Sequence, residues 1–360
     1  MPRVLLVTGG AGFIGVNFVH YWLRTHARDR VIVLDALTYA GHRASLEAVE
    51  SNPDVRFVTG DIRDAALVQE LLRAERVDTV VHFAAESHVD RSIESSDEFI
   101  STNVVGTHVL LKAAWQAWRA DGATAPARRF HHVSTDEVYG SLSATDPAAH
   151  ENTPYAPNSP YAASKAAADH IVRAFHRTYG LPVTVTTCSN NYGPFQFPEK
   201  LIPLTIVHAL EGKPLPVYGR GENIRDWLHV EDHCRAIDVV LAGGRPGERY
   251  NVAGRNAWRN IDIVRHLCGV LNTRFRDQPE LAQRFPACPA ARGRPIEALI
   301  SFVADRPGHD WRYAVDDSKL ARELAWSPAE RFETGIALTV QWYLDHEPWW
   351  REVLRRRAVS

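Results

Sequence analysis

The chain has 360 residues, of which 45% are hydrophobic and 23% are charged, and its formal net charge is −2. This composition supports a core large enough for one α/β unit with a smaller lobe. The balanced charge argues against a nucleic-acid or membrane-surface partner, since either would require a concentrated basic face. No apolar run approaches the roughly 18 residues that a membrane-spanning helix needs.

The chain enters its first apolar run, Val4–Thr8, without the basic region, apolar stretch and cleavage site of a secretion signal. Its four cysteines, Cys188, Cys234, Cys268 and Cys288, are scattered and form no CxxC pair. We expect them to be reduced thiols in or near the core. Both features predict a cytoplasmic protein.

Short apolar runs alternate with helix-length segments through the first half of the chain. The expected strands are Val4–Thr8, Val31–Asp35, Val55–Thr59, Thr79–Phe83, Phe130–Ser134 and Val183–Ser189. The expected helices are Phe13–Ala27, Ala65–Ala74, Phe99–Ala120 and Tyr161–Tyr179. Because the apolar runs are continuous rather than alternating, the strands should be covered on both faces. The pattern predicts an α/β fold with a doubly wound parallel sheet, of the Rossmann type.

Proline and glycine become frequent after about residue 190, which indicates a change of architecture. We expect residues 1–190 to form the Rossmann domain. Residues 191–360 should form a smaller C-terminal lobe that is interleaved with returns to the main sheet. The segment Arg274–Arg294 is rich in Arg and Pro and has no clear period, so we expect a surface insertion there.

Three glycines follow the first expected strand in a GxxGxxG pattern: Gly9, Gly12 and Gly15. Glycine allows the backbone to turn tightly and to approach a pyrophosphate closely, and the following helix directs its free N–H groups at the phosphates. Asp35 ends the next strand and can accept hydrogen bonds from an adenosine ribose. Because that carboxylate would repel an added phosphate, the pattern predicts NAD rather than NADP.

An Asp61-Ile62 pair follows the third expected strand. Asp61 could hold the edge of an adenine ring while Ile62 covers its face. An ordinary helix N-cap explains the same aspartate equally well.

Tyr161 and Lys165 form a YxxxK pair on an expected helix, where residues four apart share a face. A lysine near a phenol should lower the pKa of the phenol and make it a usable base. With Thr135 at the end of the fifth strand, the chain resembles the extended short-chain dehydrogenase/reductase family. That resemblance implies that Thr135, Tyr161 and Lys165 form the site of hydride transfer.

Two adjacent carboxylates, Asp136 and Glu137, come directly after Thr135. Mutual repulsion and partial burial should raise one pKa, leaving one acid and one base for the elimination of water. An acidic turn would be the ordinary explanation of the pair alone. With the preceding motifs, however, the stretch resembles the signature of the nucleotide-sugar 4,6-dehydratases. In the dTDP-glucose enzymes of that family, the resemblance implies that the Asp is the acid and the Glu is the base.

The resemblance to the dTDP-glucose 4,6-dehydratases covers almost the whole chain. Its longest motifs are Leu37–Gly41, Phe83–Ser92, Asn190–Pro194 with Pro198–Pro203, Arg225–His233 and Asp305–Asp310. The Arg274–Arg294 segment is the clear departure, since it is longer than the family usually carries.

The resemblance also implies which residues contact each ligand. The cofactor residues would be Gly9, Gly12, Phe13, Ile14, Gly15, Asp35, Ala36, Leu37, Thr38, Asp61, Ile62, Phe83, Ala84, Ala85, Ser87, Thr102, Tyr161, Lys165 and Asn191. The sugar-nucleotide residues would be Ser87, Thr135, Asn190, Glu199, Lys200, Leu201, Arg225, Asn260, Arg306 and His309.

The residue types themselves add two expectations on the substrate side. Arg225 and Arg306 suit a diphosphate because guanidinium donors pair well with phosphate oxygens, although an isolated arginine is usually a solvated surface residue. Pro216-Val217-Tyr218 could stack on a pyrimidine, or could be an ordinary Pro-aromatic turn.

His229 and His233 are four residues apart and would share a face if helical. A metal helix usually adds a third ligand and a general base at fixed spacing, and HVEDH is not HExxH. We therefore expect no metal.

The resemblance implies conversion of dTDP-glucose to dTDP-4-keto-6-deoxyglucose and water, with NAD regenerated in each turnover, in deoxysugar biosynthesis such as that of rhamnose. It also implies a homodimer, whose four-helix interface would contain Phe99–Ala120 and Tyr161–Tyr179. The alternatives are a UDP-sugar epimerase or decarboxylase, which generally lacks the Asp-Glu pair, and a non-catalytic NAD-sensing protein on the same fold.

Overall fold

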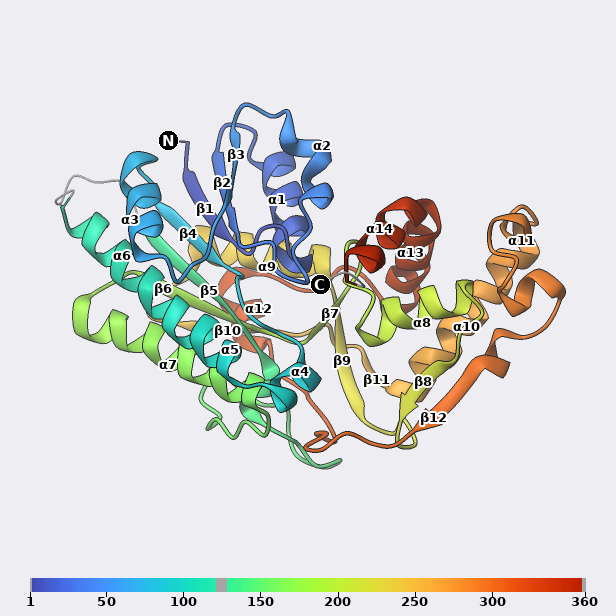
Figure 1. The fold of residues 1–360 in the computed structure, drawn as a ribbon. Helices are drawn as coiled ribbons and strands as arrows, with labels where there is room; N and C mark the ends of the chain where they lie inside the picture. Colours follow the sequence, from blue (N-terminus) through green and yellow to red (C-terminus); the bar gives the residue numbers. More distant parts are fainter. Residues whose placement is uncertain (1, 121–127, 358–360) are drawn as a thin grey trace.

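A seven-stranded sheet forms the larger part of the computed structural model, which describes residues 2–120 and 128–357 (Figure 1). The strand order is β10-β6-β5-β4-β1-β2-β3, and every pairing is parallel. The strands are β1 (Val4–Thr8), β2 (Arg30–Asp35), β3 (Val55–Thr59), β4 (Thr79–His82), β5 (Arg129–Thr135), β6 (Val183–Cys188) and β10 (Arg249–Val252). The predicted doubly wound parallel sheet is therefore confirmed.

Helices cover both faces of this sheet. On one face lie α1 (Phe13–Thr25) and α9 (Val230–Gly243), and on the other lie α3 (Ala65–Ala74), α6 (Thr107–Ala120) and α7 (Pro160–Tyr179). Neighbouring side chains of a strand point to opposite faces, so Leu5 and Val7 pack with α1 and α9, whereas Leu6 packs with α3 and α6. Burial on both faces explains why the strands are apolar without alternation.

The smaller lobe lies beside the carboxyl ends of the main sheet (Figure 1). It contains the strands β7 (Asn190–Tyr192), β8 (Leu215–Tyr218), β9 (Ile224–His229), β11 (Ala257–Arg259) and β12 (Ile300–Val303). Its helices are α8 (Leu201–Leu210), α10 (Asn260–Asp277), α11 (Leu281–Arg284), α13 (Phe332–Asp345) and α14 (Glu347–Arg357). The chain returns to the main sheet at α9 and β10, where α12 (Ser318–Leu324) packs.

Short helical turns complete the described part of the chain. The α-helical turns are α2 (Glu47–Glu50), α4 (Val89–Glu94) and α5 (Asp97–Phe99). The 3-10 turns are η1 (Arg43–Leu46), η3 (Asp136–Tyr139), η4 (Pro289–Arg292) and η5 (Ile296–Leu299).

Two sequence predictions need correction. The helix expected over Phe99–Ala120 is interrupted by a π-helix, η2 (Ile100–Gly106), between α5 and α6. Hydrophobic periodicity could not reveal this, because one π-turn leaves most of the apolar face in place. The segment Arg274–Arg294 is not a simple surface insertion, because it completes α10, forms α11 and η4, and buries Phe275, Phe285 and Cys288 in the lobe's core.

All four cysteines are buried and unpaired, as expected. Within the described ranges, no helix combines the length and the apolar character needed to cross a bilayer.

Candidate active site

One cavity of about 510 Å³ opens at the carboxyl ends of the main strands and extends to the smaller lobe. Every residue predicted for catalysis, for NAD or for the sugar nucleotide lines it, with the exception of Leu37. Leu37 adopts a positive φ of 52° and packs against the hydrophobic cluster beneath the first helix. The remaining assignments within the cavity stay predictions, but the fold brings their residues together.

The glycine turn after β1 has the shape that a dinucleotide site requires. Gly9 has a φ of +69°, and a Cβ at Gly15 would lie 2.1 Å from the Gly9 carbonyl oxygen. Asp35 stands beside this turn, where its two carboxylate oxygens accept hydrogen bonds from the backbone N–H groups of Ala11 and Leu37, at 2.9 and 2.8 Å. Each oxygen retains a lone pair for a ribose hydroxyl. A bulkier turn would fill the space that a pyrophosphate needs, so these residues fit NAD.

The alternative explanation of Asp61 is not supported. The N-cap of α3 is Asp64, whose side chain accepts hydrogen bonds from two backbone N–H groups. Asp61 instead pairs with Arg63, which lowers the pKa of its carboxyl, and it lines the cavity together with Ile62.

Tyr161 and Lys165 lie in the first turns of α7, which begins at a Ser159 cap, and both are buried. The Lys165 ammonium donates a hydrogen bond to the Val133 carbonyl, 2.7 Å away. Burial lowers the pKa of Lys165 to about 8. Burial, followed by the charge of Glu137, raises the pKa of the Tyr161 phenol well above its ordinary value. We predicted that Lys165 would lower the pKa of this phenol. That prediction is wrong for the protein without bound ligands, because burial and the Glu137 charge determine the direction of the shift.

The strand β5 ends at Thr135, and the turn η3 follows it directly. Asp136 and Glu137 therefore lie at the carboxyl end of this strand. Burial and the charge of Glu137 raise the pKa of Asp136 well above its ordinary value. Asp136 is 3% exposed, and its Oδ2 has no hydrogen-bond partner among the described residues. Such a group is most stable protonated, as a general acid requires.

Glu137 has different electrostatic surroundings. Burial raises the pKa of its carboxyl, but the positive charges of Arg306, Arg225 and Lys200 oppose that shift. Burial therefore raises both pKa values rather than one, although Glu137 has more cations opposing the rise. The roles of Asp136 as acid and Glu137 as base stay predictions.

Asp169, on the same helix as Tyr161 and Lys165, is the centre of a buried polar network that the sequence did not predict. Asp169 accepts hydrogen bonds from Ser134 Oγ at 2.9 Å and from the Tyr155 hydroxyl at 2.5 Å. His132 Nε2 and an Arg249 nitrogen lie 3.2 and 3.7 Å from its carboxylate oxygens. Burial raises the pKa of Asp169, but His132, Arg249 and Lys165 outweigh burial and lower it to about 2. Its position one turn after Lys165 was the only sequence signal.

The π-helix contributes a second missed residue. Asn103 bonds to both the N–H and the carbonyl of Glu86, at 2.8 and 2.9 Å, and donates to Ser164 Oγ at 2.8 Å. It thereby fixes the loop after β4 against the helix that carries Tyr161 and Lys165. Thr102, the neighbouring residue of the π-helix, lines the cavity.

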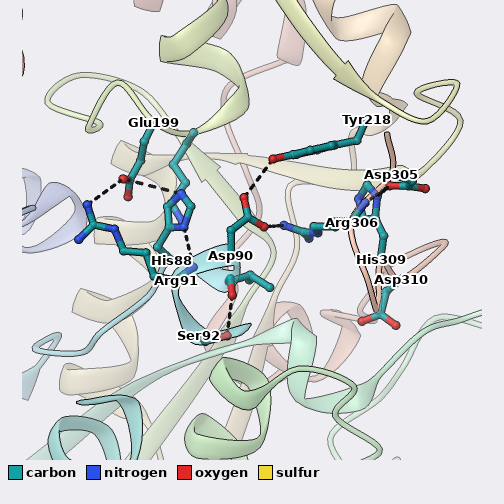
Figure 2. A network of polar contacts seen from close by, with 12 residues as sticks. His88, Asp90, Arg91, Ser92, Glu199, Tyr218, Asp305, Arg306, His309 and Asp310 are labelled. Atoms are coloured by element: carbon teal, nitrogen blue, oxygen red, sulfur yellow. Dashed lines mark hydrogen bonds and ion pairs between the residues drawn. The ribbon is translucent and has the colours of Figure 1, made fainter. Parts of the chain in front are cut away.

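The basic side chains on the substrate side are held by different partners. Arg225 is 5% exposed, which excludes a solvated surface role, and its guanidinium donates to the carbonyls of Ile224 and Asp310, both at 2.8 Å. Lys200 donates to the Ser87 carbonyl at 3.0 Å. Arg306 instead reaches across the cavity to a carboxylate of the larger domain, as Figure 2 shows.

The paired histidines do not share a helix face. His229 is the last residue of β9, whereas His233 lies within α9 and places Nδ1 2.9 Å from Asn191 Oδ1. Over the residues that the structure describes, no cluster of three or more His, Cys, Asp or Glu could hold a metal ion.

Comparison with known proteins agrees with this geometry. The family model described as GDP-mannose 4,6 dehydratase matches residues 6–339. A dTDP-glucose 4,6-dehydratase of Xanthomonas campestris pv. campestris is 58% identical, with 97% of this chain and 95% of the relative covered. The Escherichia coli dTDP-glucose 4,6-dehydratase is 50% identical, with 97% and 96% covered. The chain belongs to the dTDP-glucose 4,6-dehydratase family.

Solved structures extend the likeness to the fold. DesIV of Streptomyces venezuelae, a dTDP-glucose 4,6-dehydratase solved with NAD bound, gives a TM-score of 0.84 at 48% identity, covering 98% of this chain and 100% of DesIV. A UDP-glucose 4-epimerase of Thermotoga maritima gives 0.78 at 26% identity, covering 95% and 99%. Because dehydratases and epimerases share the fold, the reaction must be argued from the site.

Proposed function

We infer that the chain is an NAD-dependent dTDP-glucose 4,6-dehydratase, a hydro-lyase that releases dTDP-4-keto-6-deoxyglucose and water. The observation that carries this conclusion is the pair of Asp136 and Glu137, which share one cavity with Tyr161 and Lys165 yet differ in electrostatic surroundings. An epimerase needs oxidation and reduction at C4 only, so it has no use for a separate acid and base beside the hydride site.

The proposed reaction uses five side chains of the cavity. Tyr161, assisted by Thr135 and Lys165, removes the proton of the C4 hydroxyl. When bound, NAD would supply the hydride acceptor for C4 and the hydride donor for C6, together with a positive charge near the phenol. The ketone at C4 acidifies the C5 proton, which Glu137 removes while Asp136 protonates the departing C6 hydroxyl as water. Glu137 then returns a proton to C5 and completes the 6-deoxy sugar.

Substrate choice gives the direct test of this function. The purified protein should convert dTDP-glucose in preference to UDP-glucose and GDP-mannose, as followed by the ultraviolet absorbance that 4-keto-6-deoxy sugars develop in alkali. Preferential conversion of GDP-mannose would overturn the base assignment. Formation of dTDP-galactose from dTDP-glucose would overturn the dehydratase assignment in favour of an epimerase.

We also propose the division of labour expected from the sequence, with residues 1–190 binding NAD and residues 191–360 supplying most of the substrate contacts. The product would enter deoxysugar biosynthesis, such as that of rhamnose. A cytoplasmic location is supported by four buried, unpaired cysteines, which suit a reducing compartment.

A homodimer is the expected assembly. Ile93 of α4, Ile100 and Val105 of η2, and Tyr179 of α7 are 42%, 47%, 49% and 50% exposed. Burial of these apolar side chains against a second copy would stabilise the assembly. Light scattering should give the dimer mass at micromolar concentration. A monomer mass under those conditions would refute the proposal.

A further inference from the structure

The carboxylate of Asp90, in the larger domain, contacts two residues of the smaller lobe on the substrate side of the cavity. Asp90, on α4 after β4, accepts a hydrogen bond from the Tyr218 hydroxyl at 3.2 Å through one oxygen. Its other oxygen lies 3.3 Å from an Arg306 guanidinium nitrogen. Figure 2 shows this carboxylate between the tyrosine of β8 and the arginine that follows β12.

Both partners of Asp90 are candidate substrate residues, and all three line the cavity. Tyr218 is 40% exposed, and its ring makes an edge contact with His309, at 6.1 Å between ring centroids. His309 is in turn held by Asp305 at 2.6 Å. The hydroxyl bond to Asp90 therefore restrains where the phenol end of this half-exposed side chain lies.

The arginine is held in a comparable way. One terminal nitrogen of Arg306 is paired with Asp90, while its Nε has no hydrogen-bond partner among the described residues. A guanidinium fork restrained at one end and left with free donors is oriented to receive an anionic oxygen, and holding it in place reduces the entropy lost on binding.

We propose that Asp90 is a positioning residue of the nucleotide-diphosphate subsite, which presets Tyr218 for the base and Arg306 for the diphosphate. This inference rests on the proposed function for the identity of the ligand. It assigns Asp90 no contact with the reacting atoms at C4, C5 or C6. Loss of the carboxylate should therefore weaken binding and leave the chemical step nearly unchanged.

Three variants test the proposal in the full-length protein. Asp90→Ala should raise the KM for dTDP-glucose by about ten-fold, since two polar restraints are lost, and should change kcat by less than about two-fold. Asp90→Asn keeps an acceptor for Tyr218 and removes the charge, so it should rescue part of the loss. Glu94→Gln, which neutralises an exposed carboxylate on the same helix, is the matched control and should behave as the wild type.

Calorimetric binding of dTDP separates this inference from the proposed function, because it needs no turnover. Weaker dTDP binding by Asp90→Ala, with Asp90→Asn intermediate, supports the inference. Wild-type affinity in both variants, tighter binding, or an equal loss in Glu94→Gln overturns it. If Asp90→Ala does not fold, Asp90→Asn decides through the ion pair that it removes. A double-mutant cycle of Asp90→Asn with Arg306→Gln should then show non-additive losses in dTDP affinity, and additive losses would contradict the proposal. Failure of the wild type to dehydrate dTDP-glucose would refute the proposed function alone.

Discussion

Replacement of Glu137 by glutamine should stop the reaction after oxidation at C4. The amide has nearly the same size and hydrogen-bonding reach but cannot take the C5 proton. General bases typically contribute about 10²–10⁴-fold, so steady-state turnover should fall by that range. Oxidation should persist, because Tyr161, Thr135 and Lys165, which are assigned to the C4 hydroxyl, are left in place. Reduced nicotinamide should therefore accumulate on the enzyme when the variant is mixed with dTDP-glucose.

The same substitution should shift the pH dependence of C4 oxidation. Burial first, and then the Glu137 charge, raise the pKa of Tyr161. Removal of that negative charge lowers the pKa of the phenol, so the phenolate should become available at lower pH and the rising limb of the profile should move to lower pH. Rapid-mixing absorbance of reduced nicotinamide across a pH series measures this shift. An unchanged limb, or one displaced to higher pH, would refute the electrostatic coupling.

Asp136→Asn is the matched comparison, because it removes the acid rather than the base. C4 oxidation should survive, while loss of the C6 hydroxyl slows by a similar factor. Tyr161→Phe should abolish reduction of the nicotinamide altogether. Wild-type turnover in both carboxylate variants would mean that Asp136 and Glu137 form an ordinary acidic turn, and the epimerase alternative would then be preferred.

Two further outcomes follow from the described geometry. Asp35→Ala should weaken NAD binding by about ten-fold or more and relax discrimination against NADP, as measured by calorimetry with both nucleotides; retained selectivity would contradict this account. Burial lowers the pKa of His132 and His233 to about 4 and about 3 from an ordinary 6.5, so the unfolded chain takes up protons first as the pH falls. The free energy of unfolding should thus decrease below pH 6.5, by about 1.4 kcal/mol per pH unit for each histidine. Denaturant titrations at a series of pH values should show that the unfolding free energy of His233→Gln changes less with pH than that of the wild type. An unchanged pH dependence would refute the assignment.

Local features of the sequence predicted the main domain well. Continuous apolar runs between helix-length segments indicate parallel strands, and the spacing of Gly9, Gly12 and Gly15 after such a run indicates a dinucleotide turn. The YxxxK pair lies within one helix, so its two members share a face in any fold that keeps the helix. These signals depend on chemistry within a few residues of each other, which a sequence displays directly.

The features that sequence reasoning missed depend on distant parts of the chain. Asp169 is stabilised by His132 of β5 and by Arg249 of β10, strands that come together only in the folded sheet. The raised pKa of Tyr161 is caused by burial, which local spacing does not report. Asp90 looked like one polar residue of a loop motif until the fold placed Tyr218 and Arg306 beside it.

The path of the C4 hydrogen tests the proposed reaction most directly. A mixture of unlabelled dTDP-glucose and dTDP-glucose deuterated at C4 should yield dTDP-4-keto-6-deoxyglucose that carries deuterium at C6 only in molecules that began with the label, because one enzyme-bound cofactor takes and returns the hydride. Mass spectrometry and deuterium NMR locate the label. Deuterium retained at C4 of a dTDP-hexose that has lost no water would contradict the dehydratase mechanism.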